Sequence, residues 1–363
     1  MPRQAATAEQ VSRYFMATSV NPFPSLGNTV SLSPLHDAHG RNVRYLRLSV
    51  TDRCNLHCLY CRSVEQRDFI PHENILRYEE MARVVRIVHG MGVRKVRLTG
   101  GEPFARKGCD DFLAMLHARH NDLDLRLTTN ATLLEPHIPL LRRVGVSVVN
   151  ISLDSFDRAT FARVTGHDLL PSVLAAVDGL LVAGLRVKIN AVALRGVNDS
   201  QLDDFVHAAK TLPVDVRFIE FMPMGSGTRW DEQHFWPADQ IRADAERLVR
   251  LLPDDAGSDT SGPARMFRIV GGKGRLGFIS PLSNHFCASC NRLRLTSDGN
   301  VRTCLFADKE YALRGMLRTP GLDDSCIART ISNACRLKPV GAELLAARQG
   351  AAVAAKHMVG IGG

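Results

Sequence analysis

Three cysteines within eight residues, Cys54, Cys58 and Cys61, follow a short apolar run and are the residues best suited to hold a metal centre. Their Cys-x3-Cys-x2-Cys spacing puts three thiolates on one loop, and cysteine thiolates are the usual ligands of four-iron clusters. A cluster held by only three of them leaves one iron open to a substrate or cofactor, as at catalytic metal sites. Two other interpretations remain: a zinc loop that takes a fourth ligand from elsewhere, or three buried thiols.

A second set of cysteines, Cys287, Cys290 and Cys304, stands near the other end of the chain with gaps of two and thirteen residues. Considered alone, this spacing favours a zinc ribbon with His285 as the fourth ligand. An auxiliary iron–sulfur cluster is the alternative.

A short strand expected at residues 291–295 leads out of this second set. Arg292 and Arg294 are two residues apart in it, so both side chains point to one face, next to the metal. Guanidinium groups match phosphate geometry, so this pair predicts a grip for an anion.

The composition, 45% hydrophobic and 23% charged, is that of an ordinary soluble protein, and 363 residues are enough for one large α/β domain with a smaller appendage. No apolar run is long enough to span a membrane. The net charge of +9 favours an anionic partner, either nucleic acid or a polyphosphate metabolite. Aromatic residues make up only 6% and the basic residues are dispersed, which argues against a nucleic-acid binder.

The nine cysteines indicate a reducing compartment and a cytoplasmic protein, because they are grouped for metal binding and odd in number. The remaining three, Cys109, Cys326 and Cys335, have no partner at ligand spacing and are expected to be small apolar fillers.

Residues 1–42 contain few acids and no clear periodicity, and are predicted to be a flexible N-terminal extension. An organellar transit peptide is the alternative, but Pro22, Pro24 and Pro34 interrupt any basic amphipathic helix.

From residue 45 onward, short β-branched runs alternate with segments of helical period, which is typical of a parallel βα array. Strands are expected at 45–50, 95–99, 124–129, 146–152, 186–193 and 215–221, and helices at 78–89, 110–119, 134–144, 171–183 and 202–211. A closed barrel needs eight strands, so six predict a partial (βα)6 TIM-like barrel at residues 43–224. An α+β segment at 225–363, with strands at 266–270 and 275–279, is expected to cover the open side.

Polar motifs follow the strands, where barrel enzymes carry catalytic groups. Besides the cysteine loop they are Thr-Gly-Gly-Glu-Pro at 99–103, Thr-Thr-Asn at 128–130, Ser-Leu-Asp at 152–154 and Glu-Phe-Met-Pro at 220–223. Any one of them could be turn chemistry alone. In the second motif, the glycines let a ligand approach the backbone, and exposed amides with Glu102 could grip a zwitterionic amino-acid end.

The first cysteine loop, with Tyr60 in its second gap, resembles the signature loop of the radical S-adenosylmethionine (SAM) superfamily. The whole chain from about residue 44 resembles the GTP 3′,8-cyclases of molybdenum cofactor (molybdopterin) biosynthesis. The resemblance is carried by residues 47–54, 98–103, 217–222, the second cysteine set and the terminal Gly362-Gly363.

This resemblance implies a radical SAM lyase that converts GTP to (8S)-3′,8-cyclo-7,8-dihydroguanosine 5′-triphosphate. One [4Fe-4S] cluster would cleave SAM, after which the ribose C3′ loses a hydrogen and bonds to C8 of the guanine. A second [4Fe-4S] cluster, held by the second cysteine set, would leave an iron free to bind the purine.

The resemblance also implies roles for individual residues. SAM contacts are expected from Tyr60, Gly101, Ser152 and Met222, and GTP contacts from Arg47, Arg97, Thr128, Lys188, Arg292 and Arg294. Catalytic roles are expected for Arg292, Arg294, Gly362 and Gly363. The strand pattern agrees, because a cation such as Arg97 or Lys188 on a buried strand is costly unless it faces an anion; an ordinary salt bridge is the alternative.

The sequence departs from the family at Arg62-Ser63, where the family usually has Met-Pro. The implied partners are GTP, SAM, a low-potential electron donor and the next enzyme of the pathway as product acceptor, with a homodimer possible and neither nucleic acid nor membrane expected. Two other classes remain: a radical SAM enzyme that acts on a peptide or another substrate, and a metal-containing nucleic-acid binder.

Overall fold

The computed structural model describes residues 33–61, 69–225, 230–254, 262–347, 354–356 and 358–362, and Leu32–Gly363 form one compact unit. The extension predicted for residues 1–42 lies outside the described residues as far as residue 32. Residues 33–42 do not belong to an extension, because Leu35 is only 2% exposed and its N–H donates to Met91 O at 3.0 Å.

Six parallel strands form the middle of the sheet, each hydrogen-bonded to the next in chain order. They are β1 (Tyr45–Ser49), β2 (Lys95–Thr99), β3 (Asp124–Thr129), β4 (Val148–Ser152), β5 (Arg186–Ala193) and β6 (Asp215–Glu220). All six strands expected from the sequence are confirmed, with ends that differ by two residues at most.

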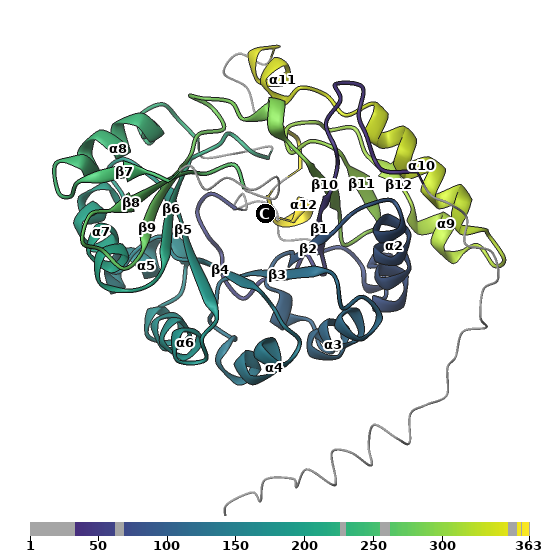
Figure 1. The fold of residues 1–363 in the computed structure, drawn as a ribbon, viewed down its shortest axis with the longest axis horizontal. Coiled ribbons are helices and arrows are strands. Elements are labelled where there is room, and N and C mark those ends of the chain that lie inside the picture. Colours follow the sequence, from purple (N-terminus) through teal and green to yellow (C-terminus); the bar gives the residue numbers. More distant parts are fainter. Residues whose placement is uncertain are drawn as a thin grey trace, which may run out of the picture. The chain divides into compact units, whose positions relative to one another are not determined.

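Helices connect these strands and lie outside them around a common centre (Figure 1). They are α2 (Tyr78–Gly90), α3 (Cys109–Arg119), α4 (Ile138–Arg143), α5 (Arg158–Thr165), α6 (Leu170–Val182) and α7 (Leu202–Thr211). Short 3₁₀ turns occur at His72–Asn74, Pro103–Ala105, Glu135–His137 and Asp199–Gln201. The five expected helices are confirmed in place, whereas α5 was not predicted.

The alternation of side chains along each strand explains this layering. Leu46 and Leu48 of β1 point to the helix side and belong to the main apolar core, whereas Arg47 between them points to the opposite face. The face toward the helices is therefore apolar, and the face toward the centre carries the polar residues.

The C-terminal segment extends the sheet at both ends instead of lying over it. On one side β10 (Arg292–Leu295) pairs parallel with β1 and continues into β11 (Asn300–Arg302) and β12 (Tyr311–Ala312). On the other side β9 (Arg275–Ile279) pairs parallel with β6 and continues into β8 (Arg265–Ile269) and β7 (Leu251–Pro253). The result is one sheet of twelve strands with the two cysteine-bearing halves of the chain joined at β1 and β10.

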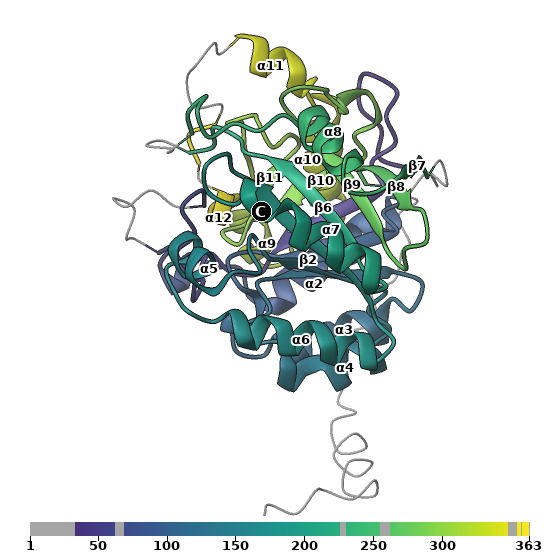
Figure 2. The ribbon, with the colours of Figure 1, turned by 90° about the vertical axis from the view of Figure 1, so that its left-hand side faces the viewer.

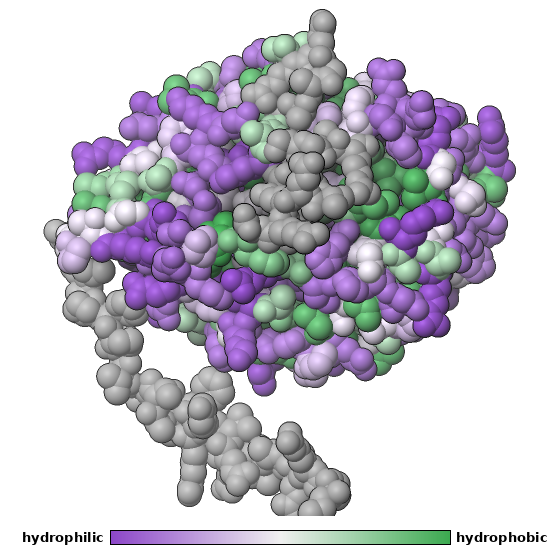
Figure 3. Space-filling view, turned by 180° about the vertical axis from the view of Figure 1, so that it is seen from behind, coloured by the Kyte–Doolittle hydropathy of each residue, from purple (hydrophilic) through white to green (hydrophobic). Residues whose placement is uncertain are grey.

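The remaining helices are α8 (Ala238–Glu246), α9 (Arg314–Arg318), α10 (Asp324–Arg336), α11 (Gly341–Ala347) and α12 (Met358–Ile361). Figures 1 and 2 both place α11 on the side of the unit opposite α4. No helix in the described ranges is long and apolar enough to cross a membrane. The face in Figure 3 is mostly hydrophilic, with apolar residues in separate groups.

Candidate active site

The first cysteine set lies on the loop after β1, at the carboxyl end of the parallel strands. Cys54 Sγ accepts hydrogen bonds from Leu56 N at 3.4 Å and Asn130 Nδ2 at 3.6 Å. Burial, followed by the nearby charges of Asp154, Cys61 and Cys54, raises the pKa of Cys58 well above its usual value. Cys54 and Cys61 thus lie near enough to Cys58 for their charges to act on it, and Cys54 has two N–H donors beside it. Three free thiols on one loop are the ligand type of an iron–sulfur cluster.

The Gly-Gly-Glu-Pro loop holds this cysteine loop in place and does not expose its own polar groups. Gly101 N donates to Thr51 O at 2.7 Å, and Glu102 N donates to Arg53 O at 2.8 Å. A Cβ on Gly101 would stand 2.1 Å from Arg53 O, so only glycine permits this approach. The expectation that these amides grip a ligand is wrong, because the cysteine loop uses them.

The carboxylate of Glu102 is likewise taken up inside the protein. It is fully buried and accepts from Thr129 Oγ1 at 2.8 Å and from Asn130 N at 2.7 Å. Burial raises its pKa to about 7. Since Asn130 in turn contacts Cys54, Glu102 positions the cysteine loop and does not bind the amino-acid end of a ligand.

The residues expected to contact SAM all lie at this carboxyl end of the sheet. Gly101 follows β2, Ser152 ends β4 and Met222 follows β6. Tyr60 Oη donates to Asp154 Oδ2 at 2.6 Å. Asp154 is fixed by Val192 N at 2.8 Å, and burial raises its pKa to about 6.

The second cysteine set lies at the opposite end of the strands. Cys287 begins a 3₁₀ turn (Cys287–Ser289) and Cys290 follows it, just before β10, whereas Cys304 follows β11, which runs antiparallel to β10. A Cβ on Gly341 would stand 3.1 Å from Cys304 Sγ and 3.3 Å from Cys287 Sγ, so both sulfurs converge on one point. The charges of Cys304 and Cys290 both act on Cys287, so the three free thiols of this set are neighbours and are of the ligand type that a cluster uses.

The zinc alternative for this set needed His285, whose Nδ1 lies 2.7 Å from Pro281 O, which leaves Nε2 as its metal-binding nitrogen. Within the described ranges, no three His, Cys, Asp or Glu side chains, those of both cysteine sets included, are arranged to hold a single metal ion, so the arrangement favours neither zinc nor a cluster.

The two sets are joined by β1 and its neighbour β10. Since a strand rises about 3.3 Å per residue, the five residues of β1 put roughly 15 Å between the two ends. A nucleotide is of similar length, so side chains along β1 and β10 can contact it from one end to the other.

Glu220 fixes the segment that leads to the second set. Its side chain is fully buried at the end of β6, where it accepts from Ala238 N and Leu282 N, both at 2.9 Å, and from Ser283 N at 3.1 Å. One carboxylate thus ties β6, α8 and the approach to Cys287 together.

Arginines occupy the central face between the two cysteine sets. In the strand register Arg47 stands between Arg97 of β2 and Arg294 of β10. Burial, together with the charges of Arg97 and Arg292, lowers the pKa of Arg47 to about 10. Burial and the charges of Arg47 and Arg292 lower the pKa of Arg294 well below its usual value. Repulsion of this kind is relieved by an anion, so the row is suited to bind one.

The outcome differs among the expected GTP contacts. Arg97 Nη1 donates to Thr128 Oγ1 at 3.4 Å, which brings those two together on the central face. Lys188 instead has the salt bridge that was the alternative, with Nζ 3.1 Å from Asp215 Oδ2. Although burial opposes it, the hydrogen bond from Arg275 and the charge of Lys188 lower the pKa of Asp215 to about 2.

Three further residues on the central face were not singled out from the sequence: Arg217, Asn150 and Asn190. Arg217 is 6% exposed, and its Nε and Nη2 have no hydrogen-bond partner among the described residues. The Oδ1 atoms of Asn150 and Asn190 are also buried without a hydrogen-bond partner among the described residues. Burial and then the charge of Arg97 lower the pKa of Arg217 to about 9. The sequence did contain a signal for Arg217: it stands between the apolar residues Val216 and Phe218 on an expected strand, so its side chain must face the central side.

The C-terminal tail enters this centre (Figure 1). Gly362 O accepts from Arg47 Nη2 at 3.1 Å and from Arg294 Nη1 at 3.2 Å, and Ile361 is fully buried. Gly362 has φ +73°, and a Cβ there would stand 3.0 Å from Thr99 Cγ2 and 3.1 Å from Ser49 Cβ. Gly363 and the departure at Arg62-Ser63 lie outside the described residues.

A cavity of about 440 Å³ opens beside the second cysteine set and is lined by residues that include Tyr45, Arg292 and Ser289. Its size is that of an ordinary small-molecule site.

Comparison with known proteins supports the fold. The chain is similar to Streptococcus suis SuiB bound to S-adenosylmethionine, with a TM-score of 0.56 and 14% identity, over 89% of this chain and 78% of that chain. At this identity the likeness shows the fold alone.

Sequence comparison is more specific. Residues 48–209 match the Radical SAM superfamily and residues 214–344 match Molybdenum Cofactor Synthesis C. The GTP 3′,8-cyclase of Rhodobacter capsulatus is 45% identical over 85% of this chain and 92% of its own length. That of Thermodesulfovibrio yellowstonii is 41% identical over 85% and 95%. The chain therefore belongs to the GTP 3′,8-cyclase family, with a radical SAM region followed by the C-terminal region of molybdenum cofactor synthesis proteins.

Proposed function

We propose that this chain converts GTP to (8S)-3′,8-cyclo-7,8-dihydroguanosine 5′-triphosphate in the first step of molybdenum cofactor biosynthesis. The observation that carries the proposal is the placement of two cysteine sets at opposite ends of the β1–β10 strand pair, with arginines between them. This arrangement would provide one site for SAM, one for the guanine and a cationic row for the triphosphate.

Membership of the radical SAM superfamily implies SAM and a [4Fe-4S] cluster, which Cys54, Cys58 and Cys61 would hold. When bound, they supply the one-electron cleavage of SAM that starts the reaction. Around them, Tyr60, Ser152 and Met222 would hold SAM at the carboxyl end of the strands, together with Gly101 through a group other than its N–H, which donates to Thr51 O.

The second cysteine set would hold a further [4Fe-4S] cluster with one iron open to the guanine. Arg47, Arg292 and Arg294 would grip the phosphates, assisted by Arg97 and Thr128. A bidentate, charge-assisted contact of this kind contributes on the order of 1.5–3 kcal/mol before desolvation. By holding both ends of the nucleotide, these residues would fix the ribose C3′ where its hydrogen is removed.

Arg217, Asn150 and Asn190 complete the proposed substrate site, because a buried guanidinium and two amide oxygens without partners can be satisfied by a polar ligand. Lys188 would stay paired with Asp215 in the absence of GTP, and a phosphate of GTP would compete with Asp215 for its ammonium group.

The architecture proposed around this site is a partial (βα)6 barrel, residues 43–224, completed by the segment 225–363. A low-potential electron donor and the next enzyme of the pathway would be its partners, in the cytoplasm. Homodimerisation stays a prediction.

Anaerobically reconstituted and reduced protein, given SAM and GTP, should form 5′-deoxyadenosine together with a cyclised nucleotide. Both products are expected because hydrogen removal and ring closure would occur in one site. ATP in place of GTP is the control, since its purine edge offers different donors. 5′-Deoxyadenosine without a cyclised nucleotide, or with a peptide product, would favour the other radical SAM class.

Iron analysis should find about eight irons per chain, because each three-cysteine set would hold a four-iron cluster. Electron paramagnetic resonance of the reduced protein should show two different clusters. About four irons with stoichiometric zinc would instead restore the zinc interpretation of the second set.

A further inference from the structure

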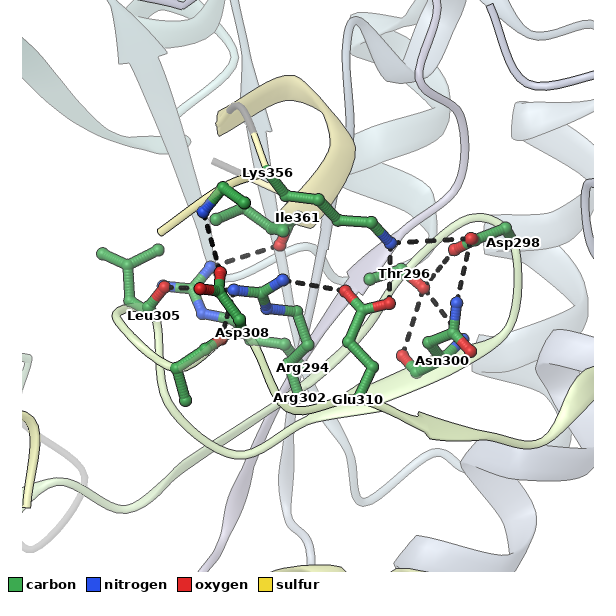
Figure 4. A network of polar contacts seen from close by, with 12 residues as sticks. Arg294, Thr296, Asp298, Asn300, Arg302, Leu305, Asp308, Glu310, Lys356 and Ile361 are labelled. Carbon is green, nitrogen blue, oxygen red and sulfur yellow. Dashed lines mark hydrogen bonds and ion pairs between the residues drawn. The ribbon is translucent and has the colours of Figure 1, made fainter. Parts of the chain in front are cut away.

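The C-terminal tail is held at a second place, well before the glycine that reaches the arginines. Lys356 Nζ lies 2.7 Å from Glu310 Oε2 and 3.6 Å from Asp298 Oδ2 (Figure 4). Its side chain is 39% exposed, whereas those of Glu310 and Asp298 are 17% and 19% exposed. A partly buried pair of acids thus meets a single cation from the tail.

These acids are fixed by the rest of the protein, independently of the tail. Glu310 Oε1 accepts from Arg302 Nη1 at 2.8 Å, and the Arg302 side chain is 1% exposed. Asp298 Oδ2 accepts from Asn300 Nδ2 at 2.9 Å. The position that Lys356 must take is therefore set by β11 and the turns around it, as Figure 4 shows.

The two residues before Lys356 are held as well. Gly225 N donates to Ala354 O at 2.9 Å, and Ala355 N donates to Asp308 Oδ1 at 2.8 Å. Three successive residues thus connect the tail to the loop after β6 on one side and to the β11–β12 connection on the other.

The far end of the tail, at Gly362, is held by the strand pair β10–β11, which also carries Glu310's partner Arg302. Arg294, which donates to Gly362 O, is the register partner of Arg302, which fixes Glu310. One antiparallel pair, β10 and β11, therefore carries both the arginine that holds the end of the tail and the acid that holds its entry point.

We infer that Lys356 is a positioning residue: its ion pair with Glu310 and Asp298 fixes where the tail enters and so keeps the Gly362 carbonyl against Arg47 and Arg294. The inference rests on the proposed function for its effect on turnover, but the anchoring itself does not. An anchored segment has fewer positions to explore, so its end spends more time at the arginines.

The test compares Lys356→Met, which keeps the apolar stem without the charge, with Lys356→Arg, which restores the charge. Hydrogen exchange of the C-terminal peptide, followed by mass spectrometry in the full chain without GTP, reports how often the tail opens. Lys356→Met should speed this exchange about fivefold, which corresponds to the loss of one ion pair near the surface. Lys356→Arg should restore most of the protection.

Turnover is the second measurement. In Lys356→Met, kcat for GTP should fall by a smaller factor than exchange rises, because turnover follows the closed fraction of the tail whereas exchange follows the open fraction, while iron content and the KM for GTP stay near wild type. Arg265→Met is the matched control, because Arg265 is 37% exposed and pairs with Asp239 at 2.6 Å in an ion pair away from the tail. It should change neither exchange of the tail nor kcat.

Exchange at the wild-type rate in Lys356→Met, or the same acceleration in Arg265→Met, would overturn the inference. Faster exchange in a protein whose wild type makes no cyclised nucleotide would keep the anchor and refute the proposed function. Failure of the anchor and failure of the proposed function would therefore give different results.

Discussion

Cys290→Ser should abolish cyclisation of GTP while leaving slow cleavage of SAM. The reason is the separation of the two cysteine sets: Cys290 lies before β10, at the end of the strands opposite to Cys54, Cys58 and Cys61. Loss of one ligand in the second set removes the open iron proposed to hold the guanine. It leaves the contacts of the first loop, with Asn130 and with the Gly-Gly-Glu-Pro loop, unchanged.

The measurement is 5′-deoxyadenosine and cyclised nucleotide in the same anaerobic assay, with iron content beside it. The variant should keep about four irons and lose at least about a hundredfold in nucleotide product, since general positioning of a bound substrate accounts for effects of that size. Cys326→Ser is the control, because Cys326 is a free thiol on α10, outside both sets. Near wild-type product from Cys290→Ser would mean that the second set is structural.

The six parallel strands could be predicted because each alternates apolar and polar residues, so that one face must meet helices and the other the centre. Leu46, Arg47 and Leu48 illustrate this. The placement of β9 and β10 could not be predicted. Local pattern identifies a strand but does not name its partner, and these two strands pair with β6 and β1 across long stretches of chain.

The two cysteine sets could likewise be picked out from spacing, because all but Cys304 are neighbours in the sequence, but their roles as cluster ligands stay a prediction. The role of Glu102 could not. Its acid looked available for a ligand, yet the structure brings Thr129 and Asn130 to it from the next strand, which leaves it fully buried. Arg217 lies in the segment 217–222 that carried the resemblance, but it was given no role, because only the folded structure shows that its Nε is buried without a hydrogen-bond partner among the described residues.

Deleting Gly362 and Gly363 should lower turnover at least about tenfold while sparing GTP affinity and cluster content. Gly362 O is an acceptor for both Arg47 and Arg294, so the tail sets the direction of two guanidinium groups in the proposed substrate site. A misdirected charge-assisted contact costs on the order of 1.5 kcal/mol or more, which is about tenfold in rate. The Kd for GTP should change little. The deletion removes an acceptor from Arg47 and Arg294 but leaves both guanidinium groups available to the phosphates.

The measurements are kcat under saturating GTP, the Kd for GTP and the iron content of the shortened chain. Gly362→Ala should have the same effect as the deletion, because its φ of +73° is strained for alanine and the added Cβ would meet Thr99 and Ser49 at 3.0 and 3.1 Å. Gly360→Ala is the matched control in the same tail, since a Cβ there meets nothing within 4 Å. It should turn over like wild type. Unchanged turnover after deletion would show that the tail occupies the centre without helping the reaction, whereas a loss of GTP affinity equal to the loss in turnover would make the tail part of substrate binding.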